Sequence, residues 1–309
     1  MAPPSPTIVQ PDWDSTKTLV SKARGRTARS NADLVSVIKK GVGVHLREMI
    51  QDWPQLDETL ESTEKGDTLL GLAARHGNAE AARLLLQAGA SPEAPNSNGS
   101  PPVHIACGEG HAGVLRILLE AESKVDATNE HGITGLLKAC YGGHSDCVSA
   151  CLKAGAAVDH ADASGTTALH LASRVAALSN AKCVRQLLAA GAPVGKTNAN
   201  QATALHFACK VGSTDTIRQL LMAGAPVDAP AANQVTPLHL ACQSGMLKCV
   251  KQLLEMKANI NAIDRDGAPP LFYAEVQGHA AVAELLSKYG AHRDVAPEFA
   301  ATGDHEFYE

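Results

Sequence analysis

The protein has 309 residues, of which 45% are hydrophobic and only 3% aromatic, and its formal net charge at pH 7 is −5. With so few aromatic rings the core must be filled by Leu, Ala, Val and Ile, which favours tightly packed helices over a β-sandwich. The negative charge excludes an overall attraction to nucleic acid or to an anionic membrane, and the lack of an 18-residue apolar run argues against a membrane span.

The chain opens with a segment that we expect to be a disordered tail, residues 1–31. It is rich in Pro and lacks the charged-then-apolar pattern of a secretory signal, so we expect a cytoplasmic protein, with the nucleus as the alternative location. A basic cluster in this tail has no role that the sequence assigns; it consists of Lys22, Arg24, Arg26 and Arg29.

The next segment, residues 32–65, carries apolar side chains at helical spacing on both sides of Gly41 and Gly43. It lacks the motif that recurs further along the chain. We interpret it as a degenerate unit that caps the N-terminal end of a domain spanning residues 32–295, because the end of a repeat array needs a polar outer face.

From residue 66 onward the sequence repeats itself. The segments "TALHLAS" at 167, "TALHFAC" at 203 and "TPLHLAC" at 236 are equivalent, and related segments start at 68, 101, 134 and 269. Each unit reads as a turn, a short helix opened by Thr or Pro, a break that usually contains Gly, and a second helix that ends in Leu-Leu. Seven units start at residues 66, 99, 132, 165, 201, 234 and 267.

These units resemble the ankyrin repeat, whose TPLHxA motif and 33-residue period both recur here. The resemblance implies an all-α solenoid of stacked helix-turn-helix units, with β-hairpin fingers projecting from one side. It also implies a non-catalytic interaction module or scaffold that binds a protein or peptide partner on its concave face. The capped ends favour a monomer.

The period also accounts for the eight cysteines. Seven of them occupy two equivalent positions, after the motif Ala or before a Val of the second helix, and equivalent positions lie roughly 10 Å apart in packed helices, too far for a disulfide. The eighth, Cys151, lies one helical turn from Cys147, which is poor disulfide geometry. We interpret all of them as buried thiols. The seven are Cys107, Cys140, Cys209, Cys242, Cys147, Cys183 and Cys249.

Seven of the 13 histidines fall on repeat positions as well. The resemblance implies that the motif His bonds the hairpin and links neighbouring repeats. No acid–base pair, nucleophile or zinc-ligand spacing stands outside the period, so we predict no enzyme activity, no cofactor and no metal. The motif positions are His104, His170, His206 and His239, and the positions after the helix break are His111, His144 and His279.

One segment matches a phosphate-binding loop, [AG]xxxxGK[ST], over residues 190–197, with Gly195, Lys196 and Thr197 at its end. Such a loop needs a strand before it and a helix after it, so that backbone amides converge on the phosphates. Here a predicted helix precedes the match and a hairpin turn follows it. Nucleotide binding is therefore a minor alternative.

Function should lie where exposed positions differ between units. The resemblance places partner contacts at the ends of the first helices and at the finger tips, where Tyr141 is a candidate anchor. The charges there alternate in sign, so a protein or peptide fits better than a nucleic acid. The candidate partner-binding residues are Arg75, His76, Glu109, Glu130, His131, Tyr141, Arg174, Val175, Lys210, Val211, Asn233, Gln243, Arg265 and Asp266.

The fourth unit departs most from the pattern, with three extra residues and no break Gly in "SRVAALSNAKCV". We expect Ser179 and Asn180 to cap its second helix, which leaves residues 174–178 as an extended first helix or a protruding loop. The insertion is either a tolerated surface feature or a partner-specific bump.

The chain closes with a predicted acidic tail, residues 296–309, whose role the sequence does not assign. An alternative function comes from "CVRQLL" and "CVKQLL", which are similar to segments of ankyrin proteins that carry a suppressor-of-cytokine-signalling box. This similarity favours a substrate adaptor of a ubiquitin ligase, although the recruiting box itself is not seen.

Overall fold

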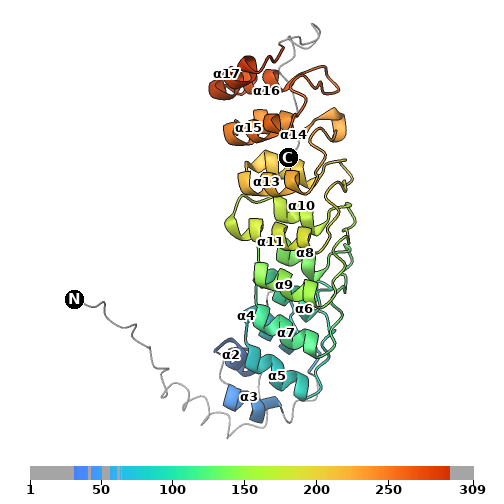
Figure 1. Ribbon diagram of the computed structural model, residues 1–309. Helices are drawn as coiled ribbons and strands as arrows, with labels where there is room; N and C mark the ends of the chain where they lie inside the picture. Colours follow the sequence, from blue (N-terminus) through green and yellow to red (C-terminus); the bar gives the residue numbers. More distant parts are fainter. Residues whose placement is uncertain (1–30, 41–42, 51–55, 61–62, 64, 293–309) are drawn as a thin grey trace, which may run out of the picture.

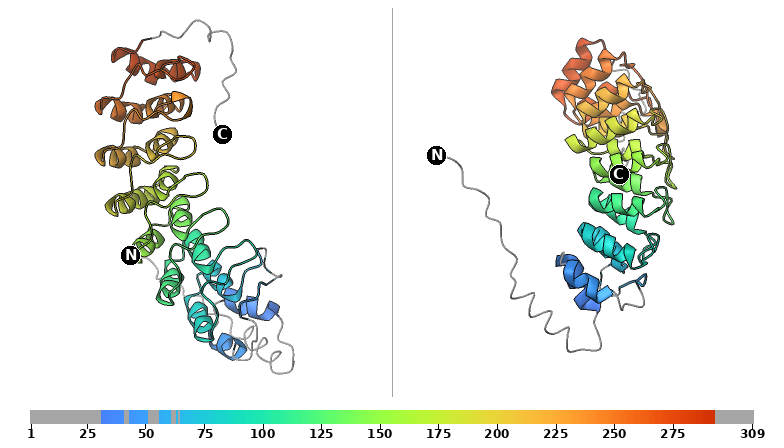
Figure 2. Two further views of the ribbon diagram at one scale, coloured as in Figure 1. Left: turned by 90° about the vertical axis from the view of Figure 1, so that its right-hand side faces the viewer. Right: turned by 60° about the horizontal axis from the view of Figure 1, so that its bottom comes forward.

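The computed structural model describes residues 31–40, 43–50, 56–60, 63 and 65–292. Within these ranges the chain is a curved stack of helix pairs whose connecting loops project along one side (Figures 1 and 2). The two tails predicted for residues 1–31 and 296–309 lie outside the described residues, except for Asn31 in the first described helix. No helix of the described part is both long and apolar enough to cross a bilayer.

The first helices of successive units pack against one another in one layer, and the second helices form a parallel layer beside them. Helices α2 and α3 extend this stack at the N-terminal end, where they pack on α4 and α5. The first helices are α2 (Asn31–Lys40), α4 (Leu69–His76), α6 (Pro102–Glu109), α8 (Gly135–Tyr141), α10 (Ala168–Ser173), α12 (Ala204–Val211), α14 (Pro237–Gln243) and α16 (Pro270–Val276). The second helices are α3 (Gly43–Ile50), α5 (Ala79–Gln87), α7 (Ala112–Glu120), α9 (Ser145–Lys153), α11 (Leu178–Ala189), α13 (Thr214–Met222), α15 (Leu247–Glu255) and α17 (Ala280–Lys288).

One column of the repeat explains why the units stack so closely. The Ala of the motif is fully buried in all seven units, so the first helices approach one another without a large side chain between them. Because no unit buries its apolar face alone, the buried residues form one core that is continuous from α2 to α17. These alanines are Ala73, Ala106, Ala139, Ala172, Ala208, Ala241 and Ala274.

The motif His links each unit to a finger, as the resemblance implies. In His206, Nδ1 accepts a hydrogen bond from the backbone N–H of Thr203 at 3.1 Å, and Nε2 donates to the carbonyl of Val235 in the next unit at 3.2 Å. His170 and His239 repeat this arrangement. His104 differs, because Pro101 replaces the Thr and leaves its buried Nδ1 without a hydrogen-bond partner among the described residues.

The fingers are tight loops rather than paired strands. Within the described residues, the sole β-pairing is an isolated bridge between Ala161 and Thr167. The loops are closed by an Asn or Asp whose Oδ1 accepts two backbone N–H groups, as Asn96 does from Asn98 and Ser100, both at 3.0 Å. The equivalent residues are Asn129, Asp162, Asn198 and Asp264.

The expectation that Ser179 and Asn180 cap the second helix of the fourth unit is wrong. Helix α11 begins earlier, at Leu178, and its N-cap residue is Ala177, so most of the insertion lengthens the helix and residues 174–177 form a short loop. Asn180 instead donates from Nδ2 to the carbonyl of Cys140 at 3.4 Å. In the second, third and seventh units a His after the break Gly donates to the last turn of the preceding first helix, as His144 does to the carbonyl of Gly108 at 3.1 Å. Asn180 reaches the carbonyl one position earlier in the register. Asn180 therefore links the start of α11 to the end of α8 in a unit that has no His at this position.

The segment that resembles a phosphate loop has a structural explanation. In several units an acidic side chain at this finger position accepts the N–H that opens the next finger, as Asp228 does from Asn259 at 2.9 Å. Gly195 stands opposite Pro226, which has no N–H to donate. Lys196 reaches back and donates from Nζ to the carbonyl of Asp159 at 2.7 Å. Helix α11 precedes this segment and α12 begins only at Ala204, so the backbone lacks the strand-loop-helix arrangement of a phosphate loop.

All eight cysteines are buried and unpaired. Burial raises the pKa of the thiols of Cys183 and Cys249 to about 11, as expected for inert core residues. One contact joins positions that are not equivalent in the repeat: the Sγ atoms of Cys107 on α6 and Cys151 on α9 are 3.6 Å apart. The roughly 10 Å spacing applies to cysteines at equivalent repeat positions, and Cys107 and Cys151 are not at equivalent positions, so that spacing does not apply to them.

Replacing Gly110 by Ala is expected to destabilise the protein more than replacing Gly155 by Ala. Both glycines have left-handed backbones, with φ +80° and +83°, so each Ala variant loses about 1 kcal/mol from the backbone alone. A Cβ on Gly110 would lie 2.6 Å from Nδ1 of His144, whereas a Cβ on Gly155 meets nothing within 4 Å. Displacing His144 should cost about 1 to 2 kcal/mol more. Urea denaturation measures the free energy of unfolding of both variants. Equal destabilisation of the two would show that the His144 side chain moves aside at no cost.

Candidate functional site

A groove of about 480 Å³ runs between the finger loops and the first helices of units one to four. Helices α4, α6, α8 and α10 form its floor, and the fingers around Asn96, Ile133 and Asp162 form its wall. Three of the candidate partner-binding residues, Arg75, Glu109 and Tyr141, come together here although the sequence separates them by more than 30 residues each. We call this surface the inner groove.

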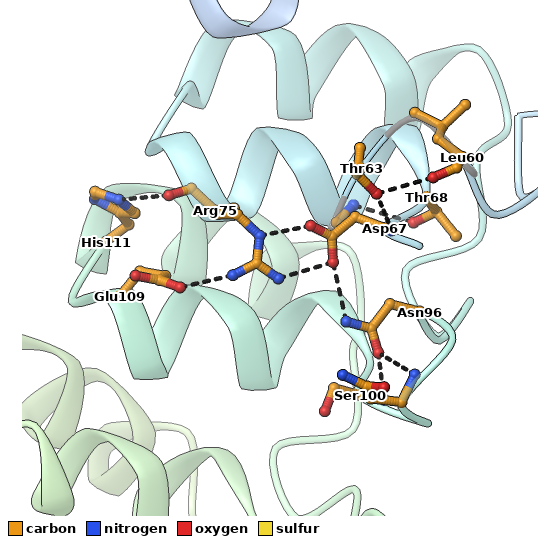
Figure 3. A network of polar contacts seen from close by, with 11 residues as sticks. Leu60, Thr63, Asp67, Thr68, Arg75, Asn96, Ser100, Glu109 and His111 are labelled. Atoms are coloured by element: carbon orange, nitrogen blue, oxygen red, sulfur yellow. Dashed lines mark hydrogen bonds and ion pairs between the residues drawn. The ribbon is translucent and has the colours of Figure 1, made fainter. Parts of the chain in front are cut away.

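At one end of the inner groove, Arg75 is held by carboxylates on two sides (Figure 3). Its Nε and Nη2 donate to Asp67 at 2.5 and 2.8 Å, and its Nη1 donates to Glu109 at 2.7 Å. The side chain of Asp67 is 1% exposed, and its Oδ1 also accepts a hydrogen bond from Asn96 at 2.9 Å. Arg75 therefore joins the first helices of two units and the finger between them.

The electrostatics of this network follow from its burial. Burial by itself would raise the pKa of Asp67, but the hydrogen bonds from Arg75 and Asn96, together with the charge of Arg75, hold that pKa below its usual value of 3.8. The same contact with Asp67 raises the pKa of Arg75. Asp67 stays ionised at neutral pH, and the charge of Arg75 is largely neutralised by its two carboxylates.

Lys138 also lines the inner groove, although it is not among the candidate residues identified from the sequence. It occupies the motif position between the His column and the buried Ala, on the third residue after the N1 position of α8. In the other six units this position holds an apolar or aromatic residue. Aligning the seven units with one another would therefore have shown Lys138 as an exception. The other residues of the column are Leu72, Ile105, Leu171, Phe207, Leu240 and Tyr273.

The side chain of Lys138 is half-buried and spans the inner groove. Its stem lies over Gly108 of α6, where an added Cβ would lie 3.7 Å from Cδ of Lys138, and its Nζ donates to Oγ of Ser100 in a finger at 3.3 Å. Burial lowers the pKa of Lys138, and the charges of Lys65 and Arg75 lower it further. The side chain of Tyr141, one turn further along α8, is 61% exposed.

The remaining candidate residues lie outside the inner groove. Lys210 lines a smaller hollow of about 150 Å³ beside Phe207 and the fingers of units five and six. Most of the others are exposed at helix ends or finger tips, while Val211, Gln243 and Asp266 are half-buried. The exposed ones are His76, Glu130, His131, Arg174, Val175, Asn233 and Arg265.

Two of these finger-tip residues also link neighbouring fingers through their backbones. The carbonyl of His131 accepts the N–H of Ala163 at 3.2 Å, and the carbonyl of Asn233 accepts the N–H of Arg265 at 2.7 Å. Their side chains are therefore presented from loops that are fixed relative to one another. Such a surface loses little conformational entropy when a partner binds.

Comparison with protein-family models gives a match over most of the chain. The matching family is described as ankyrin repeats (3 copies), and its model covers residues 33–129, 121–178, 174–264 and 229–296. No curated protein matches the chain.

Proposed function

The chain belongs to the ankyrin-repeat family, whose members generally mediate protein–protein interactions, and from this premise we propose that it binds an extended segment of a protein partner in the inner groove. The observation that carries the proposal is the position of Tyr141, an exposed aromatic side chain that lines a preformed groove. Tyr is enriched among the residues that contribute most to binding, because it buries a large area at a low cost in conformational entropy.

The proposed module is non-catalytic and acts as a monomer in the cytoplasm, with the nucleus as the alternative. The charges on the groove favour a protein over a nucleic acid, because Arg75 is bound by two carboxylates and the described groove residues therefore form no continuous basic stripe. The role of a substrate adaptor for a ubiquitin ligase stays a prediction.

Replacing Tyr141 by Ala is expected to weaken binding of a groove-directed peptide by about tenfold or more, the usual cost of removing a central aromatic contact. The peptides come from a random library displayed on phage and selected on the full chain. Tyr289 provides a matched control, because it is 60% exposed but follows α17 at the other end of the stack. Dissociation constants are measured by fluorescence anisotropy for wild type, Tyr141→Ala and Tyr289→Ala.

The proposal predicts that Tyr141→Ala loses affinity for the peptide and that Tyr289→Ala does not. Equal affinities in all three proteins would place the binding surface elsewhere, and a selection that yields no peptide would contradict peptide binding altogether. Circular dichroism checks that both variants keep the helical content of the wild type.

A further inference from the structure

The inner groove contains a half-buried cation that forms no ion pair with the carboxylates that line the groove, Glu109 and Asp162, or with Asp67 beneath Arg75. Asp67 and Glu109 both bind Arg75, and Asp162 accepts hydrogen bonds from Ser164 and Thr166 in its own finger. All three carboxylates are thus engaged by other groups. Lys138 forms no ion pair with any residue that the structure describes, and its hydrogen bond to Ser100 is with a neutral hydroxyl.

This arrangement makes Lys138 a cation that an incoming anion would stabilise. It is half-buried, which removes part of its hydration, and the charged groups that line the groove near it are Lys65 and Arg75 of like sign and Glu109, whose carboxylate is bound to Arg75. A carboxylate that pairs with a partly desolvated ammonium forms a charge-assisted hydrogen bond, which is roughly twice as strong as a neutral one. A neutral partner would not provide the opposite charge that compensates for the lost hydration of the ammonium group.

The position of Lys138 relative to Tyr141 defines what kind of ligand reaches both. The two residues are three positions apart on α8, so they lie on one face with Cβ atoms about 5–6 Å apart. A peptide in an extended conformation advances about 3.3 Å per residue, so side chains two positions apart point the same way and lie about 7 Å apart. A pair of such peptide side chains can therefore contact Lys138 and Tyr141 at the same time.

We propose that Lys138 sets the specificity of the inner groove by pairing with an Asp or Glu side chain of the partner, beside an apolar side chain that packs on Tyr141. The inference rests on the proposed function and adds the chemistry of the partner. It gives a reason for the one Lys in a column that is otherwise apolar or aromatic. Ile105 and Leu171 of this column line the same groove, and Lys138 is the one position of the column there that carries a charge.

The test compares acidic peptides with their amides. Library peptides whose binding needs Tyr141 are synthesised with acetylated and amidated ends, so that no terminal carboxylate contributes, and each Glu or Asp is replaced by Gln or Asn. The wild type is expected to bind the acidic form about tenfold more tightly, as one charge-assisted hydrogen bond implies. In Lys138→Leu this ratio is expected to fall to about one.

Leu is a matched substitution because Leu171 and Leu240 occupy the same column in this chain. Lys138→Gln removes the charge while keeping most of the stem, and it replaces Lys138→Leu if circular dichroism shows an altered fold. Lys251→Leu, at an exposed position of α15, is the control for a general loss of positive charge and should keep the tenfold ratio.

The outcomes separate the two proposals. If the peptides need Tyr141 but show no preference for the acid, or if Lys138→Leu keeps that preference, the assignment to Lys138 is overturned and the groove remains the binding site. If binding does not depend on Tyr141, the proposed function fails and the assignment to Lys138 fails with it.

Discussion

Lowering the pH from 7.5 to 5 is expected to reduce the free energy of unfolding by about 4 kcal/mol through two buried histidines alone. Burial lowers the pKa of His104 and His206 from 6.5 to about 4. The unfolded chain therefore binds more protons than the folded chain between these pH values, and stability is lost as the pH falls. Linkage gives about 2 kcal/mol for each at pH 5.

His170 and His239 add to this loss, because burial lowers their pKa values as well. The geometry supports the direction of the shift in His170, His206 and His239. Nδ1 of each accepts a backbone N–H, so a proton on that nitrogen would replace a hydrogen bond by two opposed donors. Urea denaturation followed by circular dichroism at several pH values measures the loss.

His104→Leu provides the control for this prediction. Leu137 occupies the same column in the third unit. Nδ1 of His104 has no hydrogen-bond partner among the described residues, so the variant loses only the bond from Nε2 to the carbonyl of Ala127 at 2.7 Å, which lowers stability at both pH values. The variant is expected to lose about 2 kcal/mol less than the wild type between pH 7.5 and pH 5. An unchanged pH dependence would show that His104 does not titrate with the lowered pKa.

Replacing Arg75 by Met is expected to destabilise the protein by about 2 to 4 kcal/mol, because it leaves the buried carboxylate of Asp67 without its cation. The hydrogen bond from Asn96 and the more weakly acting charge of Lys65 would then be left to oppose the cost of burial, so the pKa of Asp67 should rise. The substitution weakens the contacts that join the first two units and the finger between them (Figure 3). Urea denaturation at pH 7.5 measures it.

A double-mutant cycle identifies the cause. Asp67→Asn in the Arg75→Met background removes the unpaired charge, so the double variant should be more stable than Arg75→Met alone. Lys288→Ala breaks an exposed pair with Glu284 of similar length, 2.7 Å, and is expected to change stability little. If the double variant is no more stable than Arg75→Met, the loss comes from packing of the Arg75 stem and not from the buried charge.

The sequence by itself determined the fold to a large extent. The motif Ala, the motif His and the break Gly each recur at one position in most units, and the structure places the members of each column in equivalent surroundings. The physical reason is that each unit of a solenoid contacts only its neighbours, so a local pattern that repeats also repeats its contacts. The burial of the cysteines and the structural role of most repeat histidines follow from the same rule.

The tertiary structure alone decided the features that depart from the period. Lys138 in the inner groove, the two carboxylates on Arg75 and the bond from Asn180 to Cys140 all join side chains to groups 8 to 40 positions away. The consequence of an unusual residue in one unit depends on the residue that faces it in the next unit. Gly195, for example, faces Pro226, which has no N–H for an acidic side chain to accept. Sequence periodicity predicts which positions are equivalent, but the partner of a side chain that breaks the period depends on its direction and length, which only the packed stack specifies.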